Sequence, residues 1–148
     1  MNQPKYQLKA DDILSTYEFL SEDPKGKIEK LIQVTPTNYY DVFNLAFGDK
    51  DSKTGQIDDK VISNNGDSEL VLATVVSAIY AFTEKHPDSW IYATGSTKSR
   101  ARLYRMGITK YLKEVKSDFE IFGEINKTWE HFEKEVDYES FLVKRKKQ

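Results

Sequence analysis

Apolar and polar residues alternate in several short stretches of the chain, a pattern typical of strands with one buried face. Tyr17 and Phe19 alternate with polar neighbours in the first stretch, and Phe43, Leu45 and Phe47 do so in a later one. The strands predicted in this way are residues 15–21, 27–35, 39–47, 56–63, 89–94, 119–125 and 138–143.

Two other segments carry helical patterns. Residues 70–85 follow a capping residue, Asp67 or Ser68, and leave hardly any polar face, which predicts a helix buried on most sides and closed by Pro87. Residues 97–115 form the second helix. Its apolar face, expected to pack on the sheet, consists of Tyr104, Ile108, Tyr111, Leu112 and Val115. Residues 129–136 fit a short helix or a loop.

These elements follow one another in the order ββββαβαββ. Short turns between the early strands indicate antiparallel pairing, so we expect an α+β fold with a mainly antiparallel curved sheet and two principal helices. A length of 148 residues fits a single domain, residues 1–148. Within it we expect a loosely ordered lead-in over residues 1–13 and a basic tail over residues 144–148.

The composition excludes several kinds of chemistry. The chain has no cysteine, which removes disulfides, thiolate nucleophiles and cysteine-based metal sites. Its histidines, His86 and His131, are far apart in sequence, so we expect no metal and no cofactor. The N-terminus lacks the apolar core of a signal peptide, and the apolar run 70–82 is too short to cross a bilayer. We therefore expect a cytoplasmic protein with no membrane partner.

The segment from Gly95 to Arg105 is the most specific candidate site in the sequence. A predicted strand runs into Gly95, Ser96 and Thr97, and a predicted helix follows, so unpaired N–H groups and the helix dipole favour an anion there. Four cations lie in the segment: Lys98, Arg100, Arg102 and Arg105. With a formal net charge of −2 for the whole chain, a basic site has to be local.

The cations of this segment divide into two groups. Residues 95–100 form a possible anion cradle at the helix start. Arg102, Arg105, Lys113 and Lys116 recur at helical spacing and form a separate stripe, better suited to an extended partner. One small ligand is not expected to touch both groups.

A simpler interpretation of the segment is a turn and cap followed by a solvated helix face. The chain has 24 acidic residues that can pair with its cations. The segment also lacks the spacing of a Walker loop and of the dinucleotide-binding glycine fingerprint. Its function as an anion site therefore depends on spatial context that the sequence does not supply.

The acidic residues around the loop 48–55 form a weaker candidate site. Asp49 and Asp51 begin like a calcium loop, but Lys53 and Lys60 stand where ligands belong, so we favour turn-forming acids instead. Asp58 and Asp59 are candidate metal ligands or bases only if they lie near the cations. Three aromatic residues are candidate base-stacking platforms, although aromatics at strand spacing are more often core: Tyr39, Tyr40 and Trp90.

Several segments together resemble an uncharacterised family of small bacterial proteins, a domain of unknown function. The matching segments are residues 43–49, 57–59, 64–67, 71–75, 95–97, 100–105 and 138–143. The resemblance covers nearly the whole chain and implies a single domain, with the Gly-Ser-Thr segment and the Asp58–Asp59 pair as family hallmarks. It implies no activity, substrate or cofactor.

Three functional hypotheses follow. The leading one is a non-enzymatic binding domain whose Gly95–Arg105 region engages a nucleic acid or an acidic protein partner. The second is an enzyme on a phosphorylated substrate, such as a toxin-like nuclease, in which Lys98 and Arg100 stabilise negative charge and Asp58 or Asp59 serves as base or metal ligand. The third is a structural homodimer.

Overall fold

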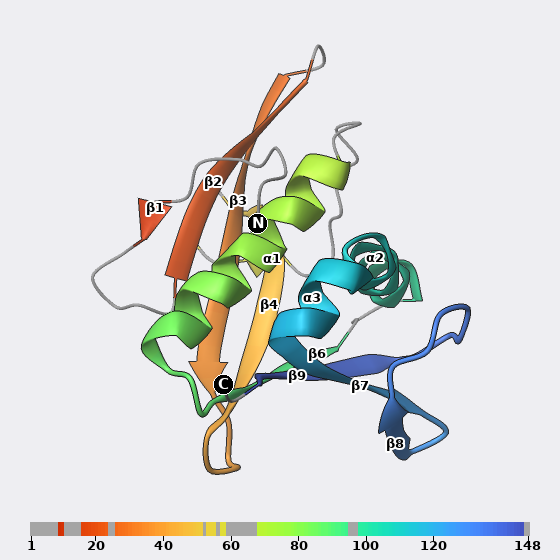
Figure 1. Ribbon diagram of the computed structural model, residues 1–148. Helices are drawn as coiled ribbons and strands as arrows, with labels where there is room; N and C mark the ends of the chain where they lie inside the picture. The colour runs from red at the N-terminus through yellow and green to blue at the C-terminus, as the bar shows by residue number, and fades with distance from the viewer. Residues whose placement is uncertain are drawn as a thin grey trace. The chain divides into compact units, whose positions relative to one another are not determined.

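The computed structural model describes residues 9–10, 16–23, 26–51, 53–55, 57–58, 68–94 and 98–146. The chain forms two compact units: Met1–Val34 with Ala46–Phe82, and Thr35–Leu45 with Thr83–Gln148. Strands β3 (Gly26–Pro36) and β4 (Val42–Lys50) and helix α1 (Ser68–Lys85) each run from one unit into the other. Figure 1 labels the elements along the chain.

The first unit contains an antiparallel hairpin of β2 (Thr16–Asp23) and β3 (Gly26–Pro36), in which Tyr17 lies opposite Ile32 and Phe19 opposite Lys30. Strand β1 (Lys9–Ala10) pairs with β2, and β5 (Ile57–Asp58) pairs with β4. No residue of α1 between Ala73 and Thr83 is exposed, which confirms the prediction of a helix buried on most sides.

The second unit places helices on one face of a sheet. The strand order is β4, β6 (Trp90–Thr94), β9 (Ser140–Arg145), β7 (Phe119–Ile125) and β8 (Thr128–His131), and every pairing except the parallel one of β4 with β6 is antiparallel. Helices α2 (Lys98–Lys110) and α3 (Leu112–Asp118) lie on one side of β6, β9 and β7 (Figure 1). Tyr104 of α2 meets Phe141 of β9 edge to face, with ring centroids 6.1 Å apart.

The predicted α+β class with a mostly antiparallel sheet is therefore confirmed, but the predicted element order is wrong in detail. The second predicted helix is two helices, because the chain leaves helical geometry at Tyr111, whose carbonyl accepts the first hydrogen bonds of α3. The preceding residues Gly107, Ile108 and Thr109 are poor helix formers, which favours a break at this point.

Three strands also differ from their predicted bounds. Strand β4 begins at Val42 rather than Tyr39, because Asp41 adopts a left-handed conformation with φ 56°. Strand β8 occupies part of the segment that fitted a helix or a loop. Strand β9 extends to Arg145, so the first two residues of the predicted basic tail belong to the sheet, where the Arg145 guanidinium lies 5.6 Å from the Phe119 ring centroid.

Three further expectations concern the lead-in, the predicted strand 56–63 and a membrane span. Lys9 and Ala10 pair with β2, while the rest of the expected lead-in 1–13 lies outside the described residues. Of the predicted strand 56–63, residues 57–58 form β5, and residues 56 and 59–63 lie outside the described residues. In the part of the chain that the structure describes, no helix is long and apolar enough to cross a membrane.

Candidate binding pocket in the second unit

A pocket of about 880 Å³ opens in the second unit where β6 ends and α2 begins. Its walls come from the end of β6, the first turns of α2, the end of β7 and the segment that leads into β9. The lining residues are Tyr92, Thr94, Lys98, Ala101, Arg102, Arg105, Glu124, Asp137, Tyr138, Glu139 and Ser140. Pockets of this size are typical of small-molecule sites.

Three hydroxyl groups form a chain along one wall. The Ser140 hydroxyl donates to Thr94 Oγ1 at 2.8 Å and lies 3.3 Å from the Tyr92 hydroxyl. The antiparallel register of β6 and β9, which sets Thr94 opposite Ser140 and Tyr92 opposite Leu142, brings these side chains together. Ser140 is buried, so the chain is a fixed part of the wall.

Three cations of α2 form the opposite wall. Lys98, Arg102 and Arg105 are spaced by four and three residues, which places them on one face of the helix. Lys98 and Arg102 are exposed, and neither forms an ion pair with another described residue. Arg105 is half-buried and forms an ion pair with Asp137 through Nη1.

The pocket joins residues that the sequence had divided into two groups. Lys98 of the predicted cradle lies with Arg102 and Arg105 of the predicted stripe, whereas Lys113 and Lys116 belong to α3 and do not line the pocket. Gly95, Ser96 and Thr97 lie outside the described residues, and of Arg100 the structure describes only its place in α2.

Sequence reasoning missed the acidic half of the pocket. Glu124, Asp137 and Glu139 carry three formal negative charges against the three positive ones of α2, which gives a formal sum of zero. Asp137, Glu139 and Ser140 lie about forty residues after the basic segment, and pairing of β9 with β6 brings them back to it. No local pattern in the sequence marks that pairing.

Tyr138 anchors the acidic side. Its hydroxyl donates to Glu130 Oε2 at 2.8 Å and accepts the Glu133 N–H at 3.0 Å. Burial, and then the hydrogen bond to Glu130, raises the pKa of Tyr138 above its usual value. The ring covers Gly123 so closely that a Cβ at that position would overlap it.

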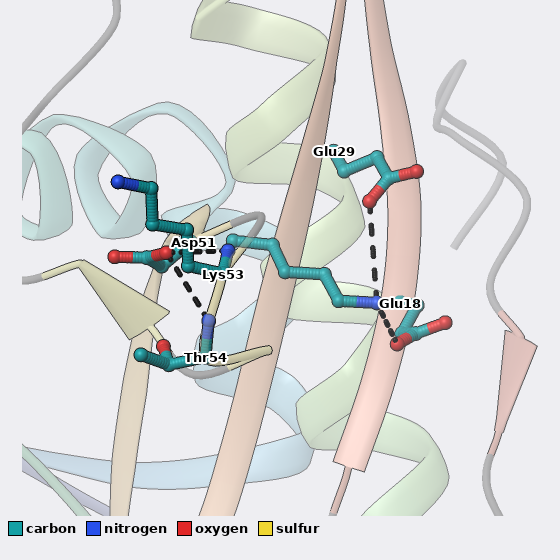
Figure 2. Close-up of polar contacts among 6 residues, drawn as sticks. Glu18, Glu29, Asp51, Lys53 and Thr54 are labelled. Atoms are coloured by element: carbon teal, nitrogen blue, oxygen red, sulfur yellow. Dashed lines mark hydrogen bonds and ion pairs between the residues drawn. The ribbon is translucent and has the colours of Figure 1, made fainter.

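The acidic loop of the first unit behaves as a turn (Figure 2). Asp51 Oδ1 accepts the N–H groups of Lys53 at 2.7 Å and Thr54 at 3.3 Å, which is the backbone bonding expected of a turn-forming acid. Asp49 instead binds Lys30. Lys50 donates to Glu18 at 3.1 Å, and this hydrogen bond raises the pKa of Lys50.

The acidic pair of the enzyme hypothesis is only partly described. Asp58 lies opposite Asp49 in the β4–β5 ladder of the first unit, and Asp59 lies outside the described residues. Lys98 and Arg100 belong to the second unit, so their proximity to the acidic pair stays a prediction. Among the residues that the structure describes, no three His, Asp or Glu side chains are grouped to hold a metal ion.

The fold and the pocket define a small α+β protein with a charged, hydroxyl-lined pocket of ligand size. The chain belongs to a family of unknown function, DUF6934, whose model matches residues 2–146. This match confirms the resemblance seen in the sequence. Neither a curated protein nor a solved structure matches the chain.

Proposed function

We propose that this protein is a non-enzymatic binding domain that takes a phosphate-bearing ligand, with nucleic acid as the partner class, in the pocket of the second unit. One observation carries the proposal: Lys98 and Arg102, both exposed, share a pocket with the hydroxyl chain of Tyr92, Ser140 and Thr94. Gly95, Ser96, Thr97 and Arg100 remain part of the proposed site on sequence grounds.

The chemistry of the α2 wall suits a phosphate. The first turn of α2 contains no acidic residue, so the positive end of the helix dipole adds to the charge of Lys98. Arg102 offers the planar pair of donors that matches two phosphate oxygens, and Lys98 acts as a point charge. The hydroxyl of Thr94 lines the same pocket and offers a further polar contact.

The hydroxyl chain supports binding rather than nucleophilic catalysis. A catalytic serine is activated by an adjacent general base. Among the residues that the structure describes, the Ser140 hydroxyl bonds to two other hydroxyls, those of Thr94 and Tyr92, rather than to a carboxylate or an imidazole. Ser140 therefore fits a positioning role in the wall of the pocket.

Fluorescence anisotropy with labelled oligonucleotides at low salt tests the proposal. The pocket variant is Lys98→Ala/Arg102→Ala, and the matched control is Lys113→Ala/Lys116→Ala, which removes the same charge from exposed positions of α3. We expect the pocket variant to weaken binding about tenfold or more, because each removed contact is a charge-assisted hydrogen bond. We expect the control to change affinity much less.

The salt dependence counts the phosphate contacts independently. Two contacts, from Lys98 and Arg102, predict a slope of log K against log salt of about −1.4 for single strands. Participation of Lys113 and Lys116 would steepen it to about −2.8. An absence of binding at low salt, or equal losses in the pocket and control variants, would contradict the proposed pocket.

A further inference from the structure

The sheet of the second unit has a second face that α2 and α3 leave uncovered. The face that the helices cover carries every second residue of β6, β7 and β9. These residues are buried: Ile91, Ala93, Phe119, Ile121, Phe141 and Val143. The other face carries Trp90, Tyr92, Phe122 and Leu142, all half-buried, while Trp129 of β8 is 38% exposed and His131 is exposed. Aromatic rings from β6, β7 and β8 therefore lie side by side on this face of the sheet.

The rings of this face contact one another in two groups. Phe122 lies between Trp90 and His131, with ring centroids 5.8 Å and 4.6 Å away. Tyr92 meets Trp129 edge to face at 6.1 Å. The ammonium of Lys144 lies 5.2 Å from the Trp90 ring centroid, so a cation borders the first group. We call this set of rings the aromatic face.

The aromatic face continues into the pocket. Tyr92 contacts Trp129 on the face and also lines the pocket beside Thr94. A ligand that places a phosphate on Lys98 and Arg102 can therefore extend past Tyr92 to the exposed ring of Trp129. Strand β6 spans about 13 Å from Trp90 to Thr94 at roughly 3.3 Å per residue, room for about two or three stacked bases.

We propose that single-stranded nucleic acid is the ligand, with one phosphate in the pocket and its bases stacked on the aromatic face; this inference rests on the proposed function. Every base has a flat face that stacks on aromatic side chains, and only unpaired bases are free to do so. A duplex offers its phosphates but not its base faces. Glu120 and Glu124 on β7 repel a phosphate backbone, which favours the α2 side of the pocket, where Lys98 and Arg102 lie.

The two tryptophans of the chain, Trp90 and Trp129, both lie on this face, so their fluorescence reports binding directly. Three probes separate stacking from charge: an oligothymidylate, an abasic oligomer with the same number of phosphates, and a duplex. We expect the oligothymidylate to quench tryptophan fluorescence and to bind more tightly than the other two. Trp129→Leu should weaken its binding by about fivefold to 150-fold, the range measured for loss of one stacked base.

Leu20→Ala is the matched control, because Leu20 is a 36% exposed apolar residue of β2 in the first unit and does not belong to the aromatic face. We expect it to leave affinity unchanged, with far-UV circular dichroism showing that both variants are folded. Equal affinity for the oligothymidylate and the abasic oligomer, with no effect of Trp129→Leu, would overturn the stacking inference and leave the phosphate pocket intact. Failure of all three probes to bind would overturn both proposals.

Discussion

The ion pair of Lys30 and Asp49 in the first unit gives a stringent prediction about stability. The Lys30 ammonium lies 2.6 Å from Asp49 Oδ1, and the two side chains are only 6% and 12% exposed. Phe19 lies directly opposite Lys30 on β2. In Asp49→Ala the ammonium stays in this apolar setting without its counter-charge, so we expect the free energy of unfolding to fall by about 3–5 kcal/mol.

Urea denaturation followed by far-UV circular dichroism measures this loss, because both tryptophans lie in the second unit and fluorescence would report mainly on that unit. Lys50→Ala is the control: Lys50 pairs with Glu18 at a more exposed site, so its loss should be much smaller. The double variant Lys30→Met/Asp49→Leu removes both charges and should recover most of the stability. A single variant as stable as the control would refute the reasoning.

Three further predictions concern the pocket. Gly123→Ala should lower the free energy of unfolding by about 1–3 kcal/mol, because its methyl group displaces the Tyr138 ring; an unchanged urea midpoint would show that the ring moves freely. Asp137→Asn should free Arg105 and tighten oligonucleotide binding about fivefold in anisotropy, equivalent to ~1 kcal/mol, and weaker binding would be contrary evidence. The pKa of Tyr138 is raised in the folded protein. The protonated Tyr138 therefore contributes its full stabilisation below the pKa of the unfolded chain, near 10, and this stabilisation is lost as the pH rises through the pKa of the folded protein. The free energy of unfolding should therefore fall more steeply above pH 10 in the wild type than in Tyr138→Phe, and parallel urea titrations would count against this.

Elements whose side chains alternate between core and solvent were predictable. Tyr17 and Phe19 in β2 and Ile121 and Gly123 in β7 are buried where the alternation places them. Strand β8 was not predictable from the sequence, because all four of its residues are exposed and no alternation of apolar and polar residues marks it. A signal for it existed: Asn126 and Lys127 both adopt positive φ in a two-residue hairpin turn, and Asn favours that conformation.

Other features depend on contacts that no local pattern encodes. The inward position of Lys30 follows from its partner Asp49, nineteen residues later. The parallel pairing of β4 with β6 requires a long crossover, and sequence alternation gives no information about which strands it joins. The same holds for the pocket: the sequence identified its cations, while its hydroxyls and acids come from strands that meet β6 only in the folded chain.

The acidic residues of the pocket change the kind of ligand that the cations favour. In the sequence, Lys98, Arg102 and Arg105 suggest a site of strong positive field, but Asp137 binds Arg105, and Glu124 and Glu139 line the opposite wall. Because the pocket has a formal charge of zero in a chain of net charge −2, long-range attraction contributes little to binding. Carboxylates accept hydrogen bonds and need a donor on the ligand. A fully deprotonated inorganic phosphate has no donor, whereas the sugar hydroxyls and base amino groups of a nucleotide do donate hydrogen bonds. For the proposed ligand, we therefore expect a nucleotide unit to bind more tightly than an inorganic anion, because of acidic residues that the sequence did not reveal as part of the site.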